Sequence, residues 1–180
     1  MKTRTALLVI DVQNAFFTKG SATYAYRAEK YLATIRMLIE RARRAGVPVI
    51  FIQHDGQKGS PFEPGKPGWP IHPDIKPKKG ELVINKLTPD SFHGTMLHSE
   101  LDKRGIKNLI IVGIQSDWCV DTTVRRAYSL GYELTVVEDA HTTYDTNILK
   151  APQIIAHHNS IFGGRFARLE KAGEVDFGKR

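Results

Sequence analysis

Two features are scarce in this sequence of 180 residues: cysteine and long apolar runs. A single cysteine, Cys119, excludes an internal disulfide framework. The apolar stretch at residues 6–10 is too short for a signal-peptide core or for a membrane span. We therefore expect a cytoplasmic protein with no membrane association.

Length and composition favour one domain that covers residues 1–180. Hydrophobic residues make up 41% of the chain and charged residues 25%, which is near the average for globular proteins. This length allows one sizeable core but is short for two domains.

The net charge of +7 raises the possibility of a nucleic-acid or anionic-surface partner. Basic clusters occur at residues 41–44 and 76–79. The first cluster follows Glu40 on an amphipathic helical pattern, and no basic motif is interleaved with aromatic residues. A solvated helix face explains this cluster better, so we expect no nucleic-acid partner. The excess charge would also steer an anionic small substrate.

Short apolar runs alternate with helical spacing along the chain. The runs predict strands at 6–10, 47–52, 82–84, 109–112 and 134–137, and the spacing predicts helices around 32–42, 96–101, 120–127 and 148–161. Strands that alternate with helices indicate an α/β domain whose mostly parallel sheet is covered on both faces.

Three chemically reactive side chains follow predicted strands. Asp11 comes after the first strand, Lys86 after the third and Cys119 after the fourth. Open α/β sheets bind ligands at the carboxyl ends of their strands, so these side chains are expected to meet at one edge. Taken singly, Asp11 also suits a turn or helix cap, Lys86 a solvent-facing strand end, and Cys119 a buried packing position.

A carboxylate, an ammonium and a thiol together predict nucleophilic catalysis. Cys119 is expected at the start of a helix, where the helix dipole favours thiolate over thiol, and Lys86 would stabilise that thiolate. Asp11 would accept the thiol proton and later transfer it to a leaving nitrogen.

The segment at residues 56–80 is rich in Pro, Gly and Lys and contains Phe62 and Trp69. A loop of this length inside one domain is usually functional or disordered. We interpret it as an active-site loop, with a tolerated surface insertion as the alternative.

Four segments resemble the isochorismatase-like cysteine hydrolases. They are residues 7–17 around Asp11, residues 85–92 around Lys86, residues 113–123 around Cys119, and residues 137–140. Residues 89–95, 139–143 and 153–159 are further similar to a branch of small bacterial hydrolases that includes streptothricin hydrolase.

The resemblance implies a Rossmann-like three-layer sandwich with a six-stranded sheet, a catalytic triad of Asp11, Lys86 and Cys119, and a homodimer or homotetramer. It also implies a cis peptide between Ile114 and Gln115. That peptide would direct the backbone N–H groups of Gln115 and Cys119 at the oxyanion formed during the reaction.

Departures from the family patterns narrow the expected reaction. Nicotinamidases of this superfamily carry an Asp-x-His metal motif after the second strand, which is broken here, so we expect no metal or other cofactor. His54, Asp55 and His72 remain candidates for an improvised metal site. Members that hydrolyse the vinyl ether of isochorismate generally lack the cysteine. Retention of Cys119 therefore favours hydrolysis of an amide, ureide or lactam.

The expected substrate is a small molecule held by side chains near the triad motifs or in the loop. The candidate wall residues are Gln13, Phe16, Trp69, Phe92, His93, Trp118 and Tyr144. Any of these residues is also compatible with the core, Phe16 and Phe92 most of all. The alternatives to an amidohydrolase are a vinyl-ether hydrolase, a nucleic-acid-binding module and a non-catalytic family member.

Overall fold

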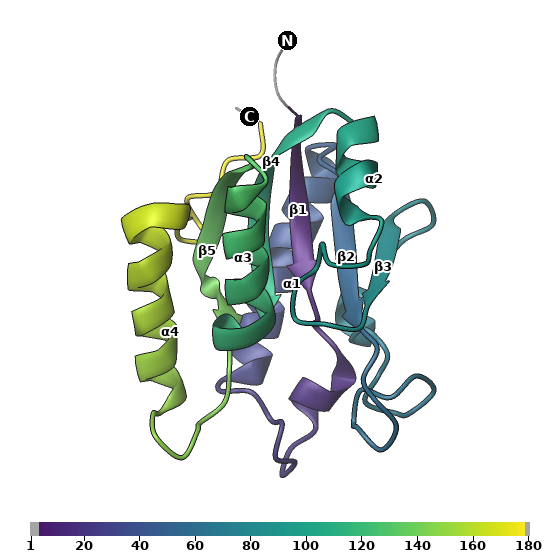
Figure 1. The fold of residues 1–180 in the computed structure, drawn as a ribbon, viewed down its shortest axis with the longest axis vertical. Helices are drawn as coiled ribbons and strands as arrows, with labels where there is room; N and C mark the ends of the chain where they lie inside the picture. The colour runs from purple at the N-terminus through teal and green to yellow at the C-terminus, as the bar shows by residue number, and fades with distance from the viewer. Residues whose placement is uncertain (1–3, 179–180) are drawn as a thin grey trace.

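One parallel sheet organises the computed structural model, which describes residues 4–178 (Figure 1). Its elements are β1 (Arg4–Ile10), η1 (Asn14–Phe17), α1 (Ala28–Arg44), β2 (Val49–His54), η2 (Pro73–Ile75), β3 (Leu82–Lys86), α2 (Leu97–Lys103), β4 (Ile106–Ile114), η3 (Ser116–Val120), α3 (Asp121–Ser129), β5 (Glu133–Thr142), α4 (Ala151–Ile161), η4 (Phe162–Phe166) and β6 (Arg168–Glu170). Within these residues the sheet has six strands in the order β3-β2-β1-β4-β5-β6. The predicted α/β class is confirmed, although the ends of the predicted domain, 1–3 and 179–180, lie outside the described residues.

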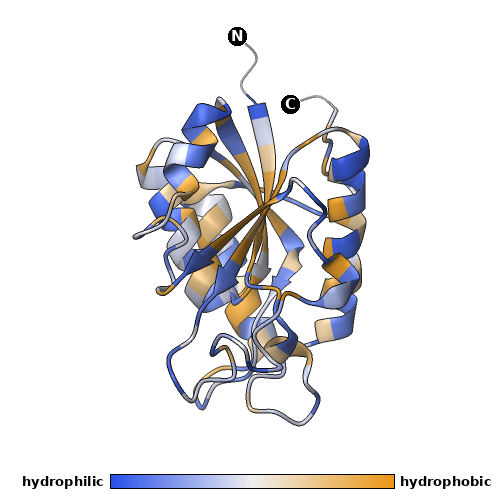
Figure 2. Ribbon diagram, turned by 90° about the vertical axis from the view of Figure 1, so that its right-hand side faces the viewer, coloured by the Kyte–Doolittle hydropathy of each residue, from blue (hydrophilic) through white to orange (hydrophobic). Residues whose placement is uncertain are grey.

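Residues 6–10 of β1 and 109–112 of β4 are continuously apolar because both faces of the sheet are covered there. In β1, Leu7 and Val9 belong to the apolar cluster beneath α1, whereas Leu8 and Ile10 belong to the cluster beneath α2 and α3. Alternate residues of a strand point to opposite faces, so one apolar run supplies two cores. Figure 2 shows the apolar strands running between helices with hydrophilic outer faces.

The helices form a layer on each face of the sheet. Helix α1 lies behind the sheet in Figure 1, and α2, α3 and α4 lie in front of it. The predicted stop of the first helix is confirmed at Gly46, which has a φ of 68°, and the Val47 N–H donates to the Ala42 carbonyl at 2.9 Å. No helix within residues 4–178 is long and apolar enough to cross a bilayer.

Two elements differ from those predicted by residue pattern. Strand β6 has only three residues, paired with β5 from Thr135 to Val137, and so short a segment shows no measurable periodicity. The last helix begins at Ala151 rather than near 148, because Pro152 fits only the first turn of a helix.

Gly113 permits the close approach of β4 to β1 that brings the strand ends together. Its φ is 136°, and a Cβ atom at this position would lie 2.1 Å from the Ile10 carbonyl oxygen. Positive φ and overpacking each cost about 1–3 kcal/mol. We expect Gly113→Ala to lower the free energy of unfolding by roughly 2–6 kcal/mol, measured by urea denaturation.

Gly131→Ala is the matched control for Gly113→Ala. Gly131 has a φ of 82°, but a Cβ atom added there would have no neighbouring atom within 4 Å. It therefore tests the cost of positive φ without the close approach. Equal losses of stability in the two variants would contradict the steric role assigned to Gly113.

Candidate active site

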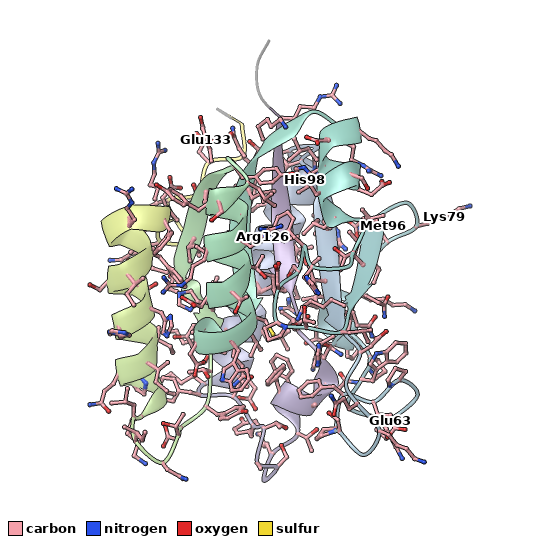
Figure 3. All side chains as sticks on the ribbon, viewed as in Figure 1. Glu63, Lys79, Met96, His98, Arg126 and Glu133 are labelled. Carbon is pink, nitrogen blue, oxygen red and sulfur yellow. The ribbon has the colours of Figure 1, made fainter. Side chains whose placement is uncertain are left out.

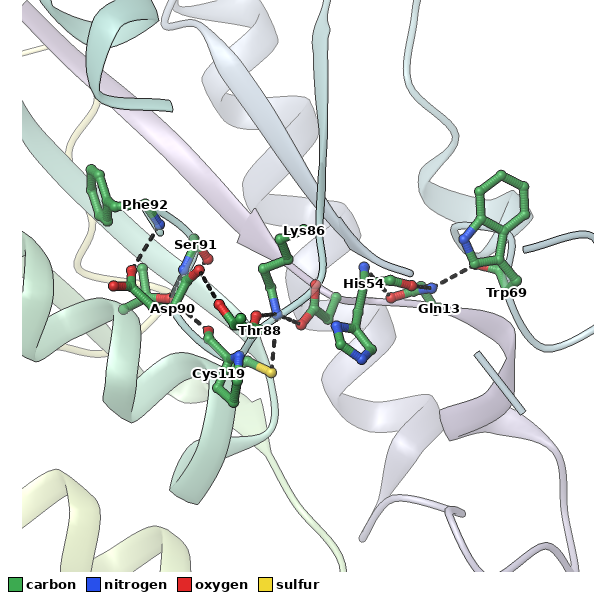
Figure 4. A network of polar contacts seen from close by, with 12 residues as sticks. Gln13, His54, Trp69, Lys86, Thr88, Asp90, Ser91, Phe92 and Cys119 are labelled. Atoms are coloured by element: carbon green, nitrogen blue, oxygen red, sulfur yellow. Dashed lines mark hydrogen bonds and ion pairs between the residues drawn. The ribbon is translucent and has the colours of Figure 1, made fainter. Parts of the chain in front are cut away.

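Asp11, Lys86 and Cys119 lie together at the carboxyl edge of the sheet. Asp11 follows β1, Lys86 ends β3, and Cys119 lies in the π-helical turn η3 between β4 and α3. Figure 4 shows the Lys86 ammonium between the sulfur of Cys119 and a carboxylate. The 56–80 loop lies at the same end of the molecule: Figure 3 shows its residue Glu63 there and Glu133 at the opposite end. The expected convergence of the three side chains is therefore observed.

Asp11 turns into the site because the chain reverses its conformation directly after β1. Its φ is 49°, in the left-handed region that aspartate adopts more readily than most residues. Its N–H still donates to the Ile52 carbonyl at 3.0 Å, as a further rung of the sheet. The carboxylate is therefore held by backbone geometry at a position where only 1% of the residue is exposed.

Lys86 is a fully buried ammonium with one ion-pair partner and two hydrogen-bond acceptors. Its Nζ lies 2.7 Å from Asp11 Oδ2, 3.2 Å from Cys119 Sγ and 3.0 Å from the Thr88 carbonyl oxygen. The buried positive charge therefore has a carboxylate counter-ion as well as two acceptors. Asp11 Oδ1, in contrast, is buried and has no hydrogen-bond partner within residues 4–178. This oxygen remains available to accept a proton.

The charges of the site favour a protonated thiol in the resting state. Burial and the Asp11 carboxylate raise the pKa of Cys119, and the opposing effect of Lys86 is smaller. Burial alone would lower the pKa of Lys86, but Asp11 and Cys119 together raise it. The expectation of a resting thiolate is therefore wrong. A local helix dipole and one cation are outweighed by burial and by a carboxylate from another strand.

The rate of thiol alkylation tests this assignment. Only the thiolate reacts with iodoacetamide, and Cys119 is the only cysteine in the chain. Because the pKa of the thiol is raised, the rate is expected to keep increasing beyond about pH 9.5, where an ordinary thiol has reached its plateau. The urea-unfolded protein is the control and should show that plateau. A plateau below about pH 8.5 in the folded protein would contradict the assignment.

The peptide bond between Ile114 and Gln115 is cis, as the family resemblance implied. The Gln115 carbonyl accepts hydrogen bonds from the N–H groups of Trp118 and Val120, at 3.2 and 3.0 Å. The carbonyl of Gln115 is thus directed into the turn that carries Cys119. The use of the Gln115 and Cys119 N–H groups as oxyanion donors stays a prediction.

Gln13 and Phe92 are two of the three predicted wall residues that are buried. Gln13 is completely buried; its amide nitrogen donates to the carbonyls of His54 and Trp69, and its amide oxygen accepts from the His54 N–H. Phe92 is 7% exposed and packs against Tyr132 with ring centroids 5.7 Å apart. In this conformation both side chains have their partners within the protein, and contact of Gln13 and Phe92 with substrate stays a prediction.

The remaining wall candidates differ in exposure. Phe16 is buried against Phe62, with ring centroids 4.7 Å apart, and Tyr144 is half-buried in the same small cluster. His93 is exposed, and Trp118, directly before Cys119, is 56% exposed. Among the candidates, Trp118 and His93 are thus the most open to a ligand.

The 56–80 loop is anchored through Trp69. The indole N–H donates to Asp55 Oδ1 at 2.7 Å, and the Trp69 carbonyl accepts from the side chains of Gln13 and Gln53. Asn85 donates to the same Asp55 oxygen at 2.8 Å. Both the main chain and the side chain of Trp69 are therefore tied to strand ends. In this conformation Trp69 supports the loop.

The improvised metal site does not form. Asp55 is engaged by Trp69 and Asn85, and His72 Nδ1 accepts a hydrogen bond from the Asp74 N–H. Within residues 4–178 no group of three or more His, Cys, Asp or Glu side chains is arranged to hold a metal ion.

His54 lies beside the triad, although the sequence suggested only a metal ligand there. It is the last residue of β2 and pairs with Lys86 across the sheet. In Figure 4 its ring lies beside the carboxylate that contacts the Lys86 ammonium. Burial and the charge of Lys86 lower the pKa of His54, and its buried Nδ1 has no partner within the described residues. Its position could have been predicted from the alternation of the strand, because His54 shares one face of β2 with Ile50 and Ile52.

Comparison with known proteins gives consistent matches. Residues 5–151 match the model of the Isochorismatase domain. Streptothricin hydrolase from Streptomyces noursei is 37% identical over 95% of this chain, which spans 60% of that protein. Ureidoacrylate amidohydrolase from Agrobacterium fabrum is 30% identical, over 76% of this chain and 75% of its own. The crystal structure of an isochorismatase from Pseudomonas putida superposes with a TM-score of 0.91, at 32% identity, over 96% of this chain and 90% of its own.

Proposed function

Because the chain belongs to the isochorismatase family of hydrolases, we propose that it cleaves the C–N bond of a small amide, ureide or lactam through a thioester on Cys119. One observation carries the proposal: a buried ammonium contacts both a carboxylate and the sulfur of a cysteine. The contacts already made by Asp55 and His72 favour a reaction without a metal cofactor.

The first half of the reaction forms the thioester. The Cys119 thiol transfers its proton to Asp11 while the sulfur attacks the substrate carbonyl, which avoids a free thiolate of high pKa. Lys86 keeps both groups in place throughout. The N–H groups of Gln115 and Cys119 are proposed to stabilise the tetrahedral oxyanion, a contribution typically worth roughly 3 kcal/mol per donor.

The second half releases the products. The tetrahedral species collapses, the C–N bond breaks, and the proton held by Asp11 passes to the leaving nitrogen. Asp11, again a carboxylate, then accepts a proton from a water molecule that attacks the thioester. The carboxylic acid product leaves as the sulfur regains that proton. Atoms and charge balance with water as the only co-substrate.

The relatives support the reaction class more than the substrate. A ureidoacrylate amidohydrolase is, by name, an amide-cleaving enzyme, and it matches three quarters of its own length. The chain spans only 60% of streptothricin hydrolase, so the activity of that protein remains a proposal here. We propose that the substrate lies against Trp118 and His93, and that the protein forms homo-oligomers.

Trapping of the acyl-enzyme tests the proposal. The protein is incubated with a panel of primary amides, ureides and lactams, with hydroxylamine as the trap, and analysed by intact mass. A substrate should release its amine and form a hydroxamate, and a mass adduct should map to the peptide of Cys119. Turnover of an amide without hydroxamate or adduct would contradict the thioester. Turnover of a vinyl ether such as isochorismate, with no turnover on the amide panel, would instead favour isochorismatase-type hydrolysis in which Asp11 acts alone.

A further inference from the structure

A second polar cluster lies beneath the active site and takes no part in the proposed reaction. His141, near the end of β5, is fully buried, and both of its ring nitrogens are hydrogen-bonded. Nδ1 lies 2.7 Å from Ser116 Oγ, and Nε2 lies 2.8 Å from Asn159 Oδ1. These contacts join the turn of the nucleophile, the end of β5 and helix α4.

The hydrogen bonds of Asn159 determine the tautomer of His141. Asn159 Nδ2 donates to the Glu138 carbonyl at 3.1 Å, and a carbonyl only accepts, so Asn159 presents its oxygen to the imidazole. His141 must therefore carry its proton on Nε2. Its Nδ1 is then an acceptor, and the Ser116 hydroxyl must donate to it. Each member of the cluster has one defined role.

Further contacts tie the same turn to β5. The register between β4 and β5 shifts after Ile111, so that Gly113 pairs with His141. The Thr143 hydroxyl donates to Asp117 Oδ1 at 2.6 Å and accepts from the Gln115 amide at 3.3 Å. Three consecutive residues, 115–117, are thus held by side chains of β5 and the residue after it, directly before Trp118 and Cys119.

We propose that Ser116, His141 and Asn159 are positioning residues that hold Cys119 in line with Lys86 and Asp11. The proposal rests on the proposed function of Cys119. The cluster does not provide a second nucleophile, because Ser116 and His141 have no exposed surface through which a substrate could reach them. It acts through the placement of the sulfur, and a misplacement of about 1 Å can cost roughly 10²-fold in rate.

The cluster keeps its hydrogen-bond directions over the physiological pH range. Burial lowers the pKa of His141 to about 4, with a smaller lowering by His158 on α4 and opposing effects of Asn159 on α4 and Asp139 on β5. The imidazole therefore stays neutral and continues to accept from Ser116. Protonation would place a donor on Nδ1 and remove that acceptor.

Ser116→Ala tests the role, with Tyr132→Phe as its control. Each variant removes one hydroxyl bonded to an imidazole, at 2.7 Å for Ser116 and at 2.8 Å between Tyr132 and His98 at the opposite edge of the sheet. Ser116→Ala is expected to lower kcat about 10- to 100-fold with KM within about threefold, and to change the rate of Cys119 alkylation. Tyr132→Phe should change none of these. Values for Ser116→Ala within twofold of the wild type would overturn the proposal.

Variants of the other two residues separate positioning from folding. Asn reproduces the Nδ1 position of histidine and Gln the Nε2 position, so His141→Asn should retain more activity than His141→Gln. In Asn159→Asp the carboxylate stabilises the imidazolium, and the fall of kcat at acid pH should begin at higher pH than in the wild type. Equal activity of the two His141 variants, or an unchanged acid limb, would argue against the proposal. Alkylation rates report on the position of the sulfur even if no tested amide is a substrate. Failure of the proposed amide hydrolysis is therefore distinguishable from failure of the positioning role.

Discussion

Cys119→Ala is expected to lower amide hydrolysis by at least about 10⁴-fold, because the thioester route requires the sulfur and no other described side chain can replace it. The fold should persist. Lys86 retains its contacts with Asp11 and the Thr88 carbonyl after the sulfur is removed, so no buried charge loses its counter-ion. The measurement is initial-rate kinetics on the best substrate of the panel, with circular dichroism to check the fold.

Cys119→Ser supplies the matched control. A hydroxyl preserves the shape of the site and the acceptor for Lys86, but a serine hydroxyl is a much weaker nucleophile than a cysteine thiol. Both variants should therefore bind substrate and fail to turn it over. Undiminished hydrolysis of an amide by Cys119→Ala would falsify the covalent mechanism. Activity of that variant on a vinyl ether would identify the protein as an isochorismatase-type enzyme.

The positions of Asp11, Lys86 and Cys119 were predictable because each follows an apolar run that reads as a buried strand. In a parallel sheet, that information alone brings the residues to one edge. The pattern carries no information on ionisation. The pKa of Cys119 depends on burial and on Asp11, which lies three strands earlier in the sequence, so an argument from the local helix dipole gave the wrong protonation state.

The substrate contacts were less predictable, because proximity in sequence does not determine the direction of a side chain. Gln13 lies two residues after Asp11, yet its amide bonds to the backbone of His54 and Trp69, 41 and 56 positions away. His54 has the right spacing to reach the site, but a metal motif in relatives suggested a different role. Tertiary hydrogen bonds decided the case of Gln13, and the pairing of β2 with β3 decided that of His54.

The role of His141 was also not predictable from the sequence. From the sequence alone, a buried and hydrogen-bonded histidine near the end of an apolar strand cannot be told from a histidine exposed at the edge of the sheet. Its significance depends on Ser116 and Asn159, which come from two other elements, and on a register shift between β4 and β5. Such a cluster becomes visible only when the strands and helices are placed together.

Asp11→Asn is expected to change hydrolysis and thiol reactivity in opposite directions. Loss of the base should lower kcat by about 10²- to 10⁴-fold. The Asp11 charge raises the pKa of Cys119, so its removal should lower that pKa and leave Lys86 facing the sulfur alone. One pKa unit changes the thiolate fraction tenfold, and we expect alkylation at pH 8 to be at least about tenfold faster. The measurements are kcat on the best amide and the rate of reaction with iodoacetamide.

Lys86→Met provides the contrast, because it removes the cation and leaves the Asp11 carboxylate. Both hydrolysis and alkylation should then fall, since the remaining negative charge further disfavours a thiolate. This variant also leaves a buried carboxylate unpaired, which typically costs about 3–5 kcal/mol, so it must be assayed well below its unfolding temperature. If the resting site were instead a thiolate–ammonium pair with Asp11 as a spectator, Asp11→Asn would leave the alkylation rate unchanged. Faster alkylation of Asp11→Asn therefore supports a general-base mechanism, and an unchanged alkylation rate supports a preformed thiolate–ammonium pair.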